Sequence, residues 1–383
     1  MHSQDPIMSL SGLWQPRIHL KNLHYGSGCV EQHLLGTLPG PSSKVFIVTG
    51  TSLANKTPLV RQLEEKLGKH HAGTITGIGQ HGPIADVERA TQVVLSHPDV
   101  DTILSLGGGS PIDTAKVISL RVKETRGTFL THLTIPTTLS AAECTAGGGY
   151  TKGDGVKVGF RAPEMGVSAI FYDPEFARYT PKDLWLSTGM RAMDHAVECM
   201  YHPSSSEVPW KALSIWAAGE LFECLPKARE SHPFDNVVTT RLMLAAYASS
   251  GLKGENLKGG MGLSHSLGHA LGSPYGIPHG ITSCMTLGKV VKLKANESAW
   301  SAKQIARLLP GVGGSLTGDD LRDALEVGDR IIALVGTLGL NIPNLSARGV
   351  GKDQTFTIAQ RALGGVKEGP AFDKVLELLQ TLF

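Results

Sequence analysis

The sequence predicts an α/β domain followed by an all-helical domain, and three observations support this fold class. Between residues 45 and 136, short apolar runs alternate with segments of helical spacing, which is typical of a parallel sheet covered by helices. After residue 181 the strand signals stop, and nearly everything up to Phe383 has helical spacing. The chain, at 383 residues, is long enough for two separate cores. We therefore predict an α/β domain over residues 8–179 and a helical domain over residues 180–383.

The individual elements follow from the spacing of apolar residues. The strands expected in the α/β domain are residues 45–49, 74–79, 102–106, 132–136 and 168–172. The helices expected between them are residues 60–67, 84–95 and 111–122. Residues 150–160 hold Gly153-Asp154-Gly155 between residues suited to strands, and this pattern predicts a hairpin.

Composition and charge exclude several classes of protein. The net charge is only +2 and no long basic run is present, so a nucleic-acid partner is not expected. No apolar run reaches the roughly 18 to 20 residues that span a bilayer, so no membrane partner is expected. The five cysteines are odd in number and form no CxxC pair, which predicts reduced thiols in the cytoplasm. Residues 1–7 resemble the remnant of an expression tag and are left out of the fold.

A glycine-rich turn is the sharpest local feature. The expected strand 102–106 runs directly into Gly107, Gly108 and Gly109. Ser110 is expected as the N-cap of the following helix, Pro111 as its first residue, and Asp113 as the partner that completes a capping box. Without side chains on the glycines, a diphosphate can lie against the backbone and the positive helix end. A tight turn that binds no ligand fits the same pattern equally well.

Two histidine-containing segments follow in the second half. Arg191, Asp194 and His195 share the polar side of a predicted helix, which by itself favours an ordinary solvated face. His265 and His269 are four residues apart and share a helix face, and a Gly/Pro-rich loop then leads to His279. Three histidines among small and apolar residues favour metal ligation or proton relay over surface or core positions.

The order of four motifs resembles the iron-containing alcohol dehydrogenase superfamily over about residues 25–295. The motifs are the GGGSPIDTAK turn, Ile135-Pro136-Thr137-Thr138, TGM(x)4HAVE and HSLGHALGSPYGIPHG. This resemblance implies the dehydroquinate synthase-like fold, with a dinucleotide-binding α/β domain, an all-helical domain and the active site between them. It also implies a homodimer, NADH or NADPH held by Gly50, Gly107, Gly108, Gly109, Ser110 and Asp113, and a nicotinamide flanked by Thr137 and Thr138.

The metal site of the superfamily is altered in this chain. Relatives hold iron or zinc with an aspartate and three histidines, and the histidine positions match His195, His265 and His279, while His269 matches a proton relay. Arg191 stands where the aspartate is expected. Two positive charges about 4 Å apart repel by about 4 kcal/mol at an effective dielectric near 20. The sequence therefore favours an enzyme without iron or zinc; ligation by the three histidines, with Asp194 as a further candidate, is the alternative.

The maleylacetate reductases form a branch of the superfamily that dispenses with the metal. The resemblance to this branch implies hydride transfer between a nicotinamide and a small oxo or unsaturated oxo substrate. Arg191 suits a substrate carboxylate, with His195, His265, His269 and His279 as its catalytic neighbours. That branch carries asparagine at the position of Arg191. No carboxylate follows the first strand at Gly50, so NADPH is expected to be accepted.

Three other functions fit the same residues. A metal-dependent alcohol dehydrogenase or aldehyde reductase would lose activity with its metal. A non-redox dehydratase or cyclase would use the histidines as acid and base without oxidising a nicotinamide. A non-catalytic binding protein on the same scaffold is the third alternative.

Overall fold

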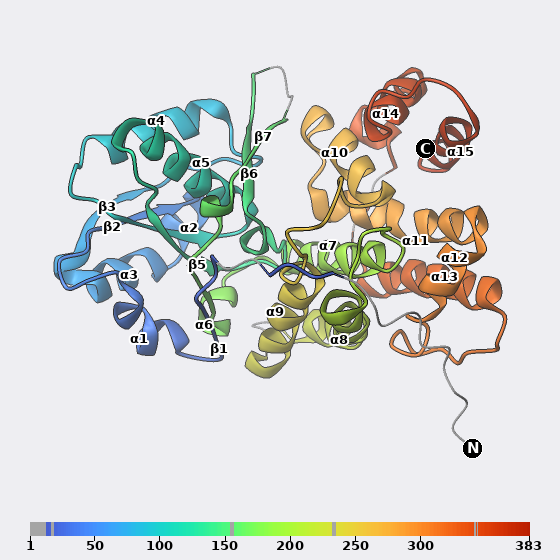
Figure 1. The fold of residues 1–383 in the computed structure, drawn as a ribbon, viewed down its shortest axis with the longest axis horizontal. Coiled ribbons are helices and arrows are strands. Elements are labelled where there is room, and N and C mark those ends of the chain that lie inside the picture. Colours follow the sequence, from blue (N-terminus) through green and yellow to red (C-terminus); the bar gives the residue numbers. More distant parts are fainter. Residues whose placement is uncertain (1–12, 17–18, 154–156, 232–234, 341, 343) are drawn as a thin grey trace.

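The computed structural model describes residues 13–16, 19–153, 157–231, 235–340, 342 and 344–383, so the expected tag remnant lies outside the described residues. The first part of the chain forms a parallel sheet with helices on both faces, and the part from Lys182 onward consists of packed helices (Figure 1). Within the described residues, the last strand ends at Tyr172. The predicted fold class is therefore confirmed, whereas the domain division at residues 179 and 180 stays a prediction.

The main sheet has six strands in the order β1-β8-β5-β4-β2-β3, and every neighbouring pair is parallel. Its strands are β1 (Asn22–Tyr25), β2 (Val45–Thr49), β3 (His71–Ile75), β4 (Thr102–Gly107), β5 (Thr131–Pro136) and β8 (Ala169–Tyr172). The central strands β2 and β4 are buried along their whole length, because helices cover both faces of the sheet.

Helices cover the sheet because alternate strand residues point to opposite faces. Val45 and Ile47 pack toward the side of α1 and α3, whereas Phe46 and Val48 pack toward α4 and α5. The helices of this part are α1 (Cys29–His33), α2 (Thr51–Lys56), α3 (Leu59–Leu67), α4 (Ile84–Leu95), α5 (Gly109–Arg126) and α6 (Pro174–Ala177).

Most expected elements of the α/β part are present, and one strand is displaced. The strand expected at residues 74–79 is instead β3, which ends at Ile75, because the chain turns at Gly77 with φ +85°. The expected hairpin is confirmed as β6 (Gly147–Thr151) and β7 (Lys157–Arg161). Residues 154–156 of its turn lie outside the described residues. The short edge strand β1 and helices α1 and α2 were not predicted.

The helical part is organised around α7 (Lys182–Met200), which contacts α8, α9, α10, α11 and α12. The remaining helices are α8 (Ala212–Glu230), α9 (Asn236–Ser250), α10 (Leu263–Tyr275), α11 (His279–Glu297), α12 (Ala299–Ala306), α13 (Asp320–Leu338), α14 (Thr355–Ala362) and α15 (Pro370–Gln380). Because neighbours surround α7, nearly all of its residues after Leu184 are buried, including the polar ones. Among the described helices, none is both long and apolar enough to cross a membrane.

Candidate active site

The carboxyl ends of three neighbouring strands meet at one edge of the sheet. Thr49 of β2 pairs with Leu106 of β4, and Gly107 of β4 pairs with Pro136 of β5. The residues that follow these strands, among them Gly50 and Thr137, are therefore neighbours although they are far apart in the sequence. Ligands of open parallel sheets bind at this edge. The structure thus brings the predicted dinucleotide-binding residues of three strands together.

The glycine turn is packed so tightly that side chains would not fit. Gly107 has φ +137°, a conformation that side chains rarely adopt. A Cβ on Gly108 would lie 3.0 Å from Cγ2 of Thr138. The backbone therefore lies directly against Thr138, whose buried hydroxyl has no hydrogen-bond partner among the described residues. A bare backbone beside an unpartnered hydroxyl fits a dinucleotide, which supplies phosphate and ribose oxygens.

The predicted capping of α5 was wrong. The helix begins at Gly109 with Gly108 as N-cap, and no side chain caps it. The hydroxyl of Ser110 instead accepts a hydrogen bond from the backbone N–H of His81, at 3.0 Å. Asp113 pairs with Lys116 at 3.4 Å and with Lys157 at 3.8 Å. The helix therefore starts earlier than predicted, and its first amide groups stay available to an anion.

The polar face of α7 is buried, contrary to the expectation of a solvated face. Nη1 of Arg191 donates to Oδ2 of Asp194, three residues further along the helix, at 3.0 Å. Nη2 of Arg191 lies 3.1 Å from Nε2 of His265. A Cβ on Gly268 would lie 3.1 Å from Nη1 of Arg191, so this glycine makes room for the guanidinium. A buried cation is thereby fixed between α7 and α10.

Asp194 anchors this network through a single oxygen. Its Oδ2 accepts from Arg191, from the hydroxyl of Ser283 at 2.6 Å and from the hydroxyl of Ser264 at 3.1 Å. The side chain therefore links α7, α10 and α11. Charge-assisted bonds of this kind are the strong ones in a protein interior. Asp194 is thus engaged in positioning Arg191.

Glu198 holds the helix that carries two of the histidines. Its carboxylate accepts from the backbone N–H of Ser264 at 2.7 Å and of His265 at 3.2 Å, in the first turn of α10. A Cβ on Gly262, the N-cap of α10, would lie 2.4 Å from Oε1 of Glu198. A carboxylate at a helix N-terminus satisfies free amide groups and interacts favourably with the helix dipole. Glu198 therefore fixes the position of His265, a role that we did not predict.

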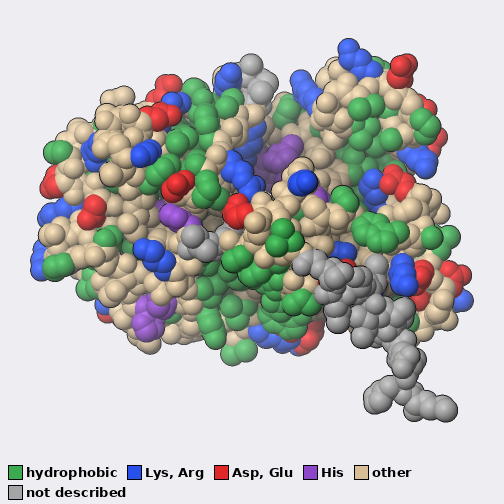
Figure 2. All heavy atoms as spheres, viewed as in Figure 1, with side chains coloured by type: hydrophobic (Ala, Val, Ile, Leu, Met, Phe, Trp, Pro, Cys, Tyr) green, Lys and Arg blue, Asp and Glu red, His purple; other side chains and the backbone are tan. Residues whose placement is uncertain are grey.

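The four predicted histidines lie together. The ring centroids of His195 and His265 are 5.5 Å apart, those of His265 and His269 are 4.8 Å apart, and those of His269 and His279 are 5.2 Å apart. A Cβ on Gly272 would lie 2.9 Å from Cε1 of His279, so a glycine in α10 makes room for this ring. Figure 2 shows histidine side chains gathered in the hollow between the two parts of the molecule, beside lysine and arginine side chains.

Burial keeps these histidines uncharged. It holds the pKa of His195, His265 and His279 well below the usual value, and the Arg191 guanidinium lowers the pKa of the last two further. His269 is partly exposed, but burial by the surrounding protein and then Arg191 lower its pKa as well. At neutral pH the cluster therefore consists of neutral imidazoles, each able to accept a proton on one nitrogen while donating from the other.

Two of the atoms that could bind a divalent metal are already engaged in hydrogen bonds. A guanidinium only donates hydrogen bonds, so Nε2 of His265 accepts from Arg191 and is not available as a ligand. Oδ2 of Asp194 already accepts three hydrogen bonds. Across the described part of the chain, no three histidine, cysteine, aspartate or glutamate side chains are placed to hold a metal ion. Arg191 also places a permanent positive charge directly beside His265 and Asp194.

Two further residues of the site come from the α/β part and were not predicted. His81 follows β3, and its ring contacts that of His279 edge to face with centroids 5.2 Å apart. The positive charge of Lys157 on β7 contributes to lowering the pKa of His81, His269 and His279. The local sequence Gln80-His81-Gly82-Pro83 indicates only a turn. The closeness of both residues to the cluster depends on long-range packing.

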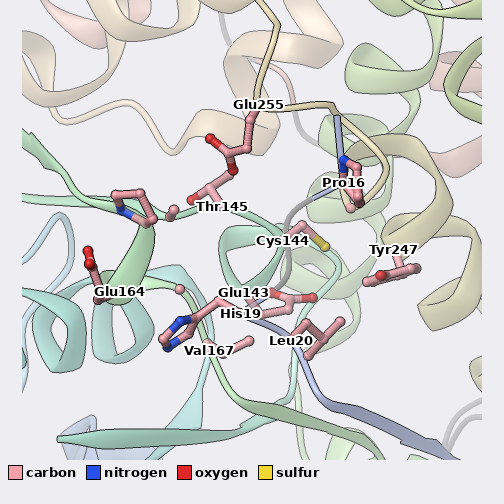
Figure 3. Close-up of a pocket in the computed structure, with 14 residues that line it drawn as sticks. Pro16, His19, Leu20, Glu143, Cys144, Thr145, Glu164, Val167, Tyr247 and Glu255 are labelled. Atoms are coloured by element: carbon pink, nitrogen blue, oxygen red, sulfur yellow. The ribbon is translucent and has the colours of Figure 1, made fainter. Parts of the chain in front are cut away.

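A separate cavity is lined in part by residues 143–146, which lie between β5 and β6. It measures about 230 Å³ and none of its lining residues belongs to the histidine cluster (Figure 3). Glu143 lines it, and Oε1 of this buried side chain accepts from the hydroxyl of Tyr172 at 2.6 Å. Burial raises the pKa of Glu143. The lining is mostly carbon, so this cavity resembles a packing space between the N-terminal segment and α9.

Comparisons with known proteins agree with this architecture. The profile of the iron-containing alcohol dehydrogenase family matches residues 21–174, and that of the C-terminal part of the same family matches residues 185–380. Maleylacetate reductase from a Rhizobium species is 28% identical over 80% of this chain and 86% of its own length. Maleylacetate reductase 2 from Cupriavidus pinatubonensis is 33% identical, but the aligned part spans only 55% of this chain and 56% of that protein.

Solved structures show the same fold along the whole chain. The crystal structure of maleylacetate reductase from Agrobacterium tumefaciens superposes with a TM-score of 0.77 at 23% identity, covering 97% of this chain and 98% of that one. An alcohol dehydrogenase from Oenococcus oeni superposes with a TM-score of 0.83 at 20% identity, covering 97% and 100%. The two family profiles together span nearly the whole sequence. The chain therefore belongs to the iron-containing alcohol dehydrogenase family of oxidoreductases.

Proposed function

We propose that this protein is an NAD(P)H-dependent reductase of a small oxo acid or unsaturated oxo acid, and that it works without a catalytic metal. The observation that carries this proposal is the buried guanidinium of Arg191, hydrogen-bonded to Asp194 and His265 inside the histidine cluster. A permanent cation in a water-poor site can stabilise a developing oxyanion, which in metal-dependent relatives is the task of the metal.

The dinucleotide would be held at the carboxyl ends of β2, β4 and β5. Gly107–Gly109 and the uncapped start of α5 would bind the diphosphate through backbone amides. Gly50 would lie beside the adenosine ribose, and Thr137 and Thr138 beside the nicotinamide. A bound nicotinamide supplies the hydride and leaves oxidised, while the substrate gains that hydride and one proton.

The substrate would lie between Arg191 and the histidines. The guanidinium would bind a carboxylate or the oxygen on which negative charge develops, because its planar fork can donate two parallel hydrogen bonds. His269 and His279 would then deliver the proton. A neutral imidazole can donate from one nitrogen and take up a proton from solvent at the other, so the number of protons balances.

The names of the relatives support a particular test substrate. Those from Rhizobium and Cupriavidus pinatubonensis are maleylacetate reductases, and maleylacetate is an unsaturated oxo acid with two carboxylates. We infer that this chain accepts maleylacetate or an acid of the same class.

We also infer that the protein forms a homodimer, as the family resemblance suggests. Light scattering after size-exclusion chromatography tests this assembly.

The experiment mixes purified protein with maleylacetate and either NADH or NADPH and follows the absorbance of the reduced nicotinamide. The same preparation is analysed for iron and zinc before and after incubation with EDTA. We expect the protein to contain less than about a tenth of an equivalent of iron or zinc. We also expect EDTA to leave its rate of turnover unchanged. Loss of activity on chelation, restored by zinc or iron, would indicate the metal-dependent alternative. Conversion of substrate without nicotinamide oxidation would indicate a dehydratase or cyclase.

A further inference from the structure

His81 adopts a backbone conformation that few residues other than glycine adopt. Its φ is +63°, and Ala141 is the other non-glycine residue with positive φ in the described chain. The left-handed region costs a residue with a side chain on the order of 1 kcal/mol. Such strain persists where the surroundings hold the residue in place. Gly79 and Gly82 lie close by in the same loop. A glycine at position 81 would also allow the turn, so the turn itself does not require a histidine.

Two hydrogen bonds hold the backbone of His81 on both sides. Its N–H donates to the hydroxyl of Ser110 in the first turn of α5, at 3.0 Å. Its carbonyl oxygen accepts from the hydroxyl of Thr151 at the end of β6, at 2.9 Å. The loop is therefore tied to the helix of the glycine turn and to the hairpin. On the His81 side these contacts use only backbone atoms, so they place the ring without occupying its nitrogens.

The ring of His81 extends the histidine cluster across the hollow. It contacts His279 edge to face, and His279 contacts His269 in turn. Nε2 of His81 is buried and has no hydrogen-bond partner among the described residues. A buried polar atom without a partner costs about 1 to 3 kcal/mol. The ring reaches the cluster from the α/β part of the chain, whereas Arg191 belongs to α7 of the helical part.

We propose that His81 is a substrate-binding residue, and that its Nε2–H donates a hydrogen bond to an oxygen of the oxo acid held by Arg191. This inference rests on the proposed function. It adds a substrate contact from the α/β part to the contact that Arg191 makes from the helical part. The oxygen acceptor would satisfy the buried Nε2. Lys157, on the hairpin that also holds His81, places a positive charge on the same side, which suits an anionic substrate.

The test compares His81→Gly with wild type. Glycine removes the ring, keeps both backbone hydrogen bonds and relieves the left-handed strain, so the variant is expected to fold. With maleylacetate as substrate, we expect KM to rise about tenfold or more, while the Kd of NADPH, measured by fluorescence, changes less than about twofold. Gln80→Gly, at the exposed neighbouring position, is the matched control and should match wild type. Asparagine tolerates the left-handed region and keeps a side-chain donor. The KM of His81→Asn should therefore lie between the KM of wild type and that of His81→Gly.

Two results would overturn the role of His81. One is an unchanged KM in His81→Gly. The other is a Kd for NADPH that rises as much as KM, which would make His81 a cofactor-binding residue. Calorimetric titration with adipate, a dicarboxylate without a reducible bond, separates this inference from the proposed function. If wild type does not reduce maleylacetate but binds adipate at least about tenfold more tightly than His81→Gly, the reaction is wrong and the role of His81 stands. If wild type reduces maleylacetate and both proteins bind adipate equally, the reaction stands and the role of His81 is wrong.

Discussion

Nη2 of Arg191 lies 3.1 Å from Nε2 of His265, so a cation and an imidazole share a hydrogen bond at the centre of the cluster. Because the guanidinium can only donate, Nε2 accepts and the proton of the neutral ring is on Nδ1. The contact determines the tautomer of His265, and burial followed by the positive charge of Arg191 lowers the pKa of this ring. The contact also leaves the Nε2 lone pair of His265 facing a positive charge, so this atom is not available as a metal ligand.

Replacement of Arg191 by methionine should separate catalysis from stability. We expect kcat to fall about 10²- to 10³-fold, the range seen when a donor to an oxyanion is removed. The free energy of unfolding should fall by about 3 to 5 kcal/mol, because Asp194 would remain buried without its cation. Adding Asp194→Asn should restore part of the stability and none of the activity. Urea unfolding and steady-state kinetics measure both effects.

The control for this substitution is Arg61→Met. Arg61 is exposed and pairs with Glu65 one turn away on α3, so its loss should leave the free energy of unfolding close to that of wild type. If Arg191→Met kept wild-type kcat, the guanidinium would have no part in the chemistry.

Alanine at Gly262 should disturb the histidines through Glu198. The new Cβ would lie 2.4 Å from Oε1 of a fully buried carboxyl group, which would have to give up its hydrogen bonds to α10 in order to move. We expect the free energy of unfolding to fall by about 1 to 3 kcal/mol and kcat to fall at least about tenfold. Gly260→Ala is the matched control, since a Cβ there meets nothing within 4 Å. Equal behaviour of the two variants would contradict the positioning role of Glu198.

A carboxylate at Gly50 should change the choice of cofactor. The backbone of Gly50, with φ −87°, suits any residue, and a Cβ there would be 3.4 Å from the nearest atom, the carbonyl oxygen of Ile78. Gly50→Asp should repel a 2′-phosphate and raise the ratio of KM for NADPH to KM for NADH by about tenfold or more. Gly50→Ala controls for size and should leave the ratio unchanged. An unchanged ratio in both would place the adenosine ribose elsewhere.

His132 should make stability depend on acid pH. Burial lowers its pKa to about 3, whereas the unfolded chain has the ordinary value of 6.5. Below that value the unfolded state takes up a proton that the folded state does not, so stability falls as the pH drops toward 3. Between about pH 7 and about pH 5, His132 should contribute a loss of about 2 kcal/mol. In His132→Gln, which cannot titrate, urea unfolding should show a loss smaller by this amount; an identical loss would mean that His132 is protonated in the folded protein.

Local patterns in the sequence were sufficient for much of the fold. Apolar runs such as Val45–Thr49 predict buried strands because only a sheet covered on both faces can hide every residue of a strand. The spacing of residues 84–95 predicted the bounds of α4 because an amphipathic helix repeats every 3.6 residues. The histidines of the candidate site were also recognisable, because their motifs are short and lie within single helices or at their ends.

The environment of those residues came from long-range packing. The polar face of α7 looks solvated in isolation, yet neighbouring helices bury Arg191 and Asp194 and so turn an ordinary ion pair into a fixed, desolvated one. His81 has no local signal, and it reaches His279 because a loop after β3 is tied to α5 and the hairpin. Periodicity records which side of an element is apolar, whereas the partner of a polar side chain depends on segments brought together only when the whole chain folds.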